Sequence, residues 1–216
     1  RALLPAVDCI LLVADSRASP ALSPREAWLF AQACEAETRL LLIHPQARAI
    51  HAGTSRWLAP RKLTMHHHAT SGDAADLARL ARFLTGNALG FVASGGGAVC
   101  AAHVGVYQSF RDEGACFDIF GGTSAGAAMA AAFAHNLTPQ EITERIEDMF
   151  VVRRAMGRFT IPRYSLFDHQ PFDEALRAHY GETDIEDLHR PFFALSTNLS
   201  TGHEYIHRSG KVWQAV

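Results

Sequence analysis

Two strand–loop–helix units that follow one another directly restrict the fold of this chain more than any other feature. In the first, the apolar segment 89–93 leads into a run of three glycines at 95–97. In the second, the apolar segment 117–120 leads into Gly-Gly-Thr-Ser-Ala-Gly at 121–126. An amphipathic or small-residue helix is expected after each loop, ending near residues 113 and 134. Alternating strands and helices predict an α/β fold with a mainly parallel sheet.

The second loop is suited to hold a serine nucleophile. A serine hydroxyl is a poor nucleophile and has to stand clear of the sheet, near a base and near hydrogen-bond donors. A sharp turn from strand to helix does this, and Gly122 and Gly126 stand on either side of Ser124, where such a turn leaves no room for a β-carbon. The alternative is a tight turn in which Ser124 only caps the next helix.

The first loop offers the donors that a serine nucleophile needs. Attack on an ester makes a tetrahedral oxyanion, which requires backbone amides about 3 Å away. We therefore predict an oxyanion hole formed by Gly95, Gly96, Gly97 and Ala125. A nucleotide-binding loop is the alternative, but Cys100 occupies the third glycine position of the dinucleotide pattern and no Lys-Ser/Thr pair follows.

The two units together resemble the patatin-like phospholipases, in particular the bacterial relatives of neuropathy target esterase. The resemblance is strongest over residues 88–150 and extends over residues 75–216, through segments 80–87 and 196–202. It implies a three-layer α/β/α sandwich with a mainly parallel central sheet. It also implies a Ser-Asp dyad without histidine, in which Ser124 forms an acyl-enzyme, and phospholipid or lysophospholipid substrates.

The chain departs from the family pattern in two ways. The family's glycine loop continues with a basic residue and a glycine, where this chain has Val99 and Cys100. The family's aspartate stands in an Asp-Gly pair, which occurs nowhere in the 216 residues, so we expect it beyond Val216. A catalytically weak or inactive member that binds lipid or regulates is the alternative function. A Ser-His-Asp triad is a third hypothesis, although His103 is expected to pack or hydrogen-bond locally.

The remaining chain divides into an accessory α/β segment, 1–74, and the catalytic domain, 75–216, which is expected to be incomplete at its C-terminal end. Segments 9–14 and 39–43 read as strands buried on both faces, joined by a helix that a Ser23–Glu26 capping box opens. This β-α-β segment is expected to extend the sheet. No cyclic-nucleotide-binding module is recognisable in it.

Further elements follow from apolar periodicity and capping residues. A helix over 73–84 is predicted to bury one stripe of apolar residues, Leu77, Leu80, Ala81 and Leu84. The remaining predictions are a helix opened by Thr138 that ends near residue 150, a helix over 173–180, and strands over 191–197 and 204–208.

We expect no bound metal and no cofactor. His66, His67 and His68 are consecutive, so on a strand they point to alternate faces and do not converge on one ion. The four cysteines form no C-x-x-C pair and are expected to be free thiols in a reducing compartment.

Charge and hydropathy exclude two classes of protein. The formal net charge of −2 gives no basic excess for a nucleic-acid partner. No apolar run approaches the roughly 20 residues of a membrane-spanning helix, and no signal peptide is evident. Both ends read as cut from a longer protein. We expect a cytoplasmic protein with peripheral contact at the inner membrane, through a basic and aromatic flap of Arg153, Arg154, Phe159, Ile161, Tyr164 and Phe167. The alternative is an ordinary surface loop whose aromatic side chains pack inward.

Overall fold

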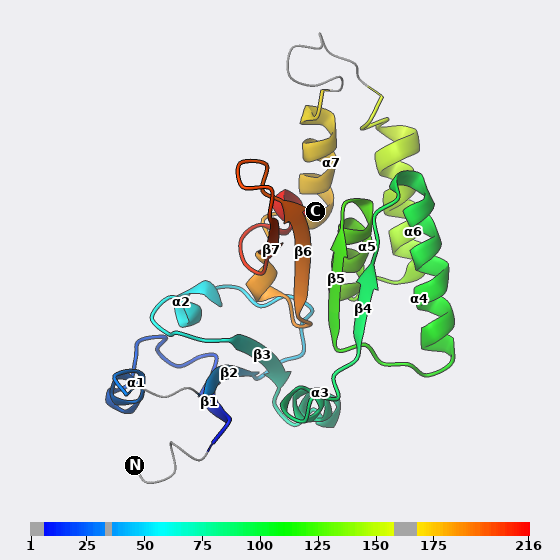
Figure 1. Ribbon diagram of the computed structural model, residues 1–216. Helices are drawn as coiled ribbons and strands as arrows, with labels where there is room; N and C mark the ends of the chain where they lie inside the picture. The colour runs from blue at the N-terminus through cyan, green and yellow to red at the C-terminus, as the bar shows by residue number, and fades with distance from the viewer. Residues whose placement is uncertain (1–6, 33–35, 158–167) are drawn as a thin grey trace. The chain divides into compact units, whose positions relative to one another are not determined.

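The computed structural model describes residues 7–32, 36–157 and 168–216 (Figure 1). The chain forms two compact units, Arg1–Leu89 and Gly90–Val216, here called the first and the second unit. The domain boundary expected after residue 74 stays a prediction. No helix within the described ranges is both long and apolar enough to cross a bilayer.

The first unit is built on a three-stranded parallel sheet with the order β1-β2-β3. Its strands are β1 (Cys9–Asp15), β2 (Glu37–His44) and β3 (Met65–Thr70), and its helices are α1 (Pro24–Phe30), α2 (Ser55–Leu58) and α3 (Ala74–Leu84). The parallel β-α-β arrangement is confirmed. The expectation that this segment extends the other sheet is wrong, because among the described residues its strands pair only with one another.

The two faces of the first sheet carry separate small cores. Leu40 and Leu42 pack with Trp57 on one face, and Leu41 and Ala69 pack with Leu80 of α3 on the other. These pairs follow from the alternation of side chains along a strand.

The prediction that α3 buries a stripe of four apolar residues is wrong for three of them, Leu77, Ala81 and Leu84. Leu80 is buried, whereas Leu77 and Leu84 are 51% and 43% exposed. The helix instead buries Asp76 and Arg79, which form an ion pair at 2.7 Å and bond to the backbone of β3. On this side of the helix, hydrogen bonds to the backbone of β3 therefore hold α3 to the sheet.

The strand over 9–14, predicted to be buried on both faces, has an exposed face, and so has the strand formed by the apolar segment 89–93. Val13 of β1 is 58% exposed, and Val92 of β4 (Gly90–Ala93) is 68% exposed. Both strands stand at an edge of their sheet, where a continuous apolar sequence does not guarantee that both faces are covered.

The second unit is built on a four-stranded sheet with the order β4-β5-β6-β7. β4, β5 (Ile119–Thr123) and β6 (Phe192–Thr197) are parallel, and β7 (Glu204–His207) pairs antiparallel with β6. The mainly parallel α/β class is confirmed; the complete three-layer sandwich stays a prediction. The helices are α4 (Ala102–Asp112), α5 (Ala125–Ala134), α6 (Pro139–Glu147), α7 (Gln170–Tyr180) and α8 (Val212–Ala215).

Helix α5 is the centre of the second unit and packs on β4, β5 and β6 (Figure 1). Five of its alanines and Phe133 are almost completely buried, as expected for a helix that is apolar on all sides. The Phe133 ring stacks on Tyr107 of α4 at 4.1 Å and meets Phe91 of β4 edge to face. Small side chains on α5 let the helix lie close to the strands that carry the loops.

Local capping fixes where two helices begin. Ser23 Oγ accepts from the Glu26 amide at 3.2 Å, and the Ser23 amide donates to the Glu26 carboxylate at 2.8 Å. Thr138 and Glu141 form the same reciprocal pair at the start of α6. The predicted Ser23–Glu26 capping box and the predicted start of a helix at Thr138 are confirmed.

Candidate active site

Ser124 occupies the turn between β5 and α5. The strand ends at Thr123 and the helix begins at Ala125, so one residue makes the whole change of direction. The backbone of Ser124 has φ 54° and ψ −139°, a conformation that non-glycine residues adopt rarely and only when the surrounding structure enforces it. Strain of this kind is typical of functional positions.

Crowding on both sides of the serine is the reason for its two glycine neighbours. A β-carbon on Gly122 would lie 2.6 Å from the carbonyl carbon and oxygen of Gly126. A β-carbon on Gly126 would lie 2.3 Å from the Ser94 carbonyl oxygen and 2.4 Å from that of Ala93. The expected lack of room at both positions is therefore confirmed. The second contact shows that the turn at residues 122–126, here called the elbow, packs directly on the first loop.

A third glycine, directly before the elbow, was not predicted to matter. A β-carbon on Gly121 would lie 2.2 Å from the ring of Phe193 on the neighbouring strand. The Gly-Gly pair that precedes the Thr-Ser dipeptide is the signal that could have found it.

The glycine loop lies against the serine side chain. A β-carbon on Gly95 would lie 3.1 Å from Ser124 Cβ and 3.8 Å from Ser124 Oγ. Gly97 has φ 58°, which lies in the left-handed region that residues with a β-carbon rarely adopt. The structure thus places the glycine run and the serine around one small region.

Two side chains from the following helical turn hold this loop in place. The Cys100 thiol donates to the Ser94 carbonyl oxygen at 3.3 Å, and a ring nitrogen of His103 lies 3.1 Å from the same oxygen. The local hydrogen bond expected for His103 is confirmed. Within the described ranges, no histidine hydrogen-bonds to Ser124. Val99, in contrast, is 77% exposed.

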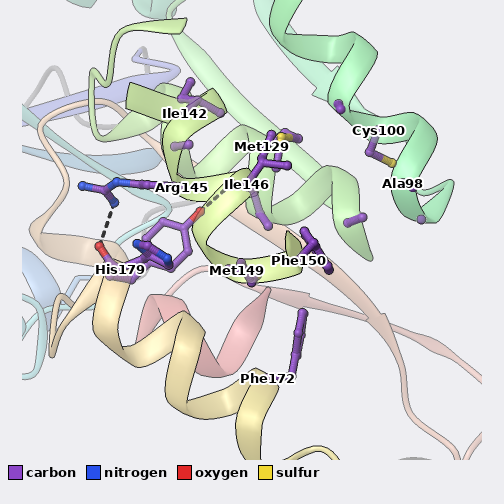
Figure 2. A pocket seen from close by; sticks show the side chains of 16 residues that line it. Ala98, Cys100, Met129, Ile142, Arg145, Ile146, Met149, Phe150, Phe172 and His179 are labelled. Atoms are coloured by element: carbon purple, nitrogen blue, oxygen red, sulfur yellow. Dashed lines mark hydrogen bonds between the residues drawn. The ribbon is translucent and has the colours of Figure 1, made fainter. Parts of the chain in front are cut away.

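An apolar cavity of about 160 Å³ opens beside the elbow. Gly97, Ala98 and Cys100 of the first loop line it together with Ala125 and Met129 of α5. Figure 2 shows how the far side is closed by larger side chains from α6, the turn after it and α7, namely Ile142, Ile146, Met149, Phe150 and Phe172. An apolar cavity of about 150 Å³ can hold benzene, so this one accepts a piece of hydrocarbon of similar size.

Three polar side chains, Arg145, His179 and Tyr180, lie at the end of the cavity. Tyr180 donates to the Ala128 carbonyl oxygen at 2.7 Å, and burial raises the pKa of its hydroxyl. Arg145 donates to the His179 carbonyl oxygen at 2.7 Å (Figure 2). Burial and the nearby Arg145 lower the pKa of His179, against the opposing effect of Asp148 at 3.0 Å. At neutral pH this end therefore holds a neutral phenol and a neutral imidazole.

Two models of known protein families match the sequence of this chain. A family model described as patatin-like phospholipase matches residues 91–216, more than half of the chain. The chain belongs to the patatin-like phospholipase family. A second model, described as the neuropathy target esterase family P-loop like domain, matches residues 2–75. The patatin-like match covers both glycine loops and the cavity, and the second match gives the accessory segment a family that its sequence alone had not indicated.

Relatives of this patatin-like protein include animal and bacterial sequences. Patatin-like phospholipase domain-containing protein 7 of Rattus norvegicus is 31% identical over 97% of this chain and 18% of its own length. Neuropathy target esterase sws of Drosophila melanogaster is 29% identical over 97% of this chain and 17% of its own length. An uncharacterized NTE family protein of Mycobacterium tuberculosis is 37% identical over 72% of this chain and 26% of its own length. The chain therefore spans at most about a quarter of these relatives.

The structure brings together most, but not all, of the site that the sequence indicated. Gly95 lies against Ser124, Gly126 lies against the Ala93 and Ser94 carbonyl groups, and Gly97 and Ala125 border the cavity. The flap residues Phe159, Ile161, Tyr164 and Phe167 lie outside the described residues, so the flap stays a prediction. The cavity itself was missed, although apolar residues at helical spacing in α6 (Ile142, Ile146 and Met149) carried the signal.

Proposed function

We propose that this patatin-like domain belongs to a serine acyl hydrolase that breaks down phospholipids or lysophospholipids, with Ser124 as the nucleophile. One observation carries the proposal. A strained serine stands at the start of α5, in contact with a glycine loop and beside an apolar cavity. A capping serine in an ordinary turn needs neither the loop nor the cavity.

The chemistry proceeds through an acyl-enzyme. Ser124 Oγ attacks the acyl carbonyl carbon while a base takes the hydroxyl proton, and the carbonyl oxygen becomes an oxyanion. The amides of Gly95, Gly96, Gly97 and Ala125 are proposed to donate to that oxyanion, aided by the positive end of the α5 dipole. Collapse breaks the bond to the glycerol oxygen and expels the lysophospholipid or glycerophosphodiester, whose new hydroxyl receives the proton. Water then attacks the ester on Ser124 and releases a fatty acid.

The proposed base is an aspartate outside these 216 residues. No Asp-Gly pair occurs in the sequence, and within the described ranges no carboxylate hydrogen-bonds to Ser124. Functional tests therefore use the full-length product of the natural gene.

The cavity is proposed to hold the acyl chain. Gly97 and Ala125 border both the elbow and the cavity, so a chain esterified to Ser124 can pass directly between Met129 and the side chains of α6. The walls offer little hydrogen bonding, which suits a hydrocarbon and disfavours a polar head group. The head group is accordingly proposed to stay on the solvent side of Ser124.

A second candidate is a lipid-binding member with little or no turnover. Val99 and Cys100 favour it, because they replace the basic residue and glycine of the family loop. Cys100 also uses its thiol on the Ser94 carbonyl oxygen, inside the loop that should receive the oxyanion.

Fluorophosphonate labelling separates the two candidates. The acyl hydrolase predicts a covalent adduct on Ser124, together with fatty-acid release that Ser124→Ala abolishes. Ser109→Ala is the matched control, because Ser109 is exposed on α4 and bonds only to its own helix. Absence of an adduct in a folded protein would overturn the hydrolase proposal. Binding of lipid vesicles without fatty-acid release would support the second candidate.

A further inference from the structure

Three histidines of the first unit, which the proposed function does not use, meet on one face of its sheet. His68 of β3 pairs with Leu42 of β2, so these two side chains share a face. His44 lies two residues beyond Leu42 and returns to that same face. His51, in the segment between β2 and α2, lies against both.

The ring nitrogens of this cluster are close enough to share one ion. One potential ligand atom from each of His44, His51 and His68 lies within 4.8 Å of the others. His44 Nε2 and His68 Nδ1 are 2.9 Å apart, and the His51 ring stacks on His44 with centroids 3.5 Å apart. All three side chains are buried, at 8%, 5% and 2% exposure respectively.

These distances suit a tetrahedral zinc ion. Zinc–nitrogen bonds of about 2.0–2.1 Å place ligand nitrogens roughly 3.4 Å apart. The 2.9 Å pair has to open by about half an ångström and the widest pair has to close by somewhat more than an ångström, which small side-chain rotations supply. Imidazole nitrogen is also a common zinc ligand in proteins.

The position in the fold also favours a binding site. His44 is the last residue of β2, and His68 lies two residues before the end of β3. In parallel α/β sheets, ligands bind beyond the carboxyl ends of the strands.

We propose that His44, His51 and His68 bind one zinc ion, with the fourth position open to water or another small ligand. The ion links β2, the segment that follows it and β3, and so stabilises this end of the first unit. The site is not the run of three consecutive histidines. His67 points to the other face, where it lies 4.9 Å from the ring of Phe83.

The test measures zinc binding to the full-length protein, prepared without a polyhistidine tag and stripped with a chelator. Isothermal titration with zinc chloride is expected to give one zinc per chain at this site. His51→Gln and His68→Gln are each expected to weaken binding by at least about tenfold, since loss of even an outer-shell partner typically costs 10–100-fold. His67→Gln is the matched control on the same strand and is expected to leave the affinity unchanged.

X-ray absorption of the zinc-loaded wild-type protein makes the test independent of how the variants fold. Three imidazole nitrogens at about 2.0–2.1 Å support the proposal. Failure to bind zinc overturns it. Binding that His51→Gln and His68→Gln leave unchanged, or a zinc shell containing sulfur, overturns it as well.

Discussion

Replacing Gly126 by alanine tests the packing between the elbow and the glycine loop. The new β-carbon would lie 2.3 Å from the Ser94 carbonyl oxygen, and contacts under 3.0 Å are essentially never seen. The two loops therefore have to separate by at least about 0.7 Å. Overpacking of this kind costs about 1–3 kcal/mol of stability. A displacement near 1 Å between a nucleophile and its donors reduces reaction rate by about a hundredfold.

Urea unfolding and the rate of fluorophosphonate labelling measure the two effects separately. Gly105→Ala is the control, because nothing lies within 4 Å of a β-carbon at that position of α4. It should raise stability by about 0.5–1 kcal/mol, as alanine replaces glycine inside a helix, and should not change labelling. If Gly126→Ala matches this control in both measurements, the packing account of the elbow is refuted.

Three further substitutions test other parts of the second unit. Ala128→Phe should fill part of the 160 Å³ cavity and reduce fatty-acid release from long-chain substrates, relative to short-chain ones, by about tenfold or more; an unchanged chain-length profile would argue against the acyl site. Thr138→Ala should lower the free energy of unfolding by about 1 kcal/mol through loss of the cap, whereas Thr143→Ala, inside the same helix, should not lower it. Burial lowers the pKa of His135 below its ordinary value of 6.5, so the unfolded chain binds the proton more readily. Stability should therefore fall as pH drops below about 6.5, and His135→Gln should weaken this dependence in urea titrations at a series of pH values; an equal slope in both proteins would contradict it.

The two glycine loops could be predicted from sequence because each carries a short glycine pattern between a strand and a helix. Gly122 and Gly126 are glycines since the backbone of their own turn and of the preceding loop leaves no space for a side chain. The Ser23 and Thr138 caps depend on residues three positions apart. Such short-range requirements leave a pattern that the sequence shows directly.

Features that depend on which segments pair could not be predicted in this way. The residues of β1 do not indicate that it forms the edge of its sheet, or that its sheet is separate from that of β4. The burial of Asp76 and Arg79 depends on the backbone of β3 lying opposite them. His44 and His68 meet because of the register between β2 and β3, which adjacent positions in the sequence do not reveal.

The most direct test of the central claim is a crystal structure of the protein with a phosphonate covalently bound to Ser124. The proposed function predicts that the phosphoryl oxygen lies about 3 Å from backbone amides of the glycine loop at 95–97 or of Ala125. It also predicts that an attached alkyl chain enters the cavity beside Met129. A phosphoryl oxygen that faces solvent, away from both sets of amides, would contradict it.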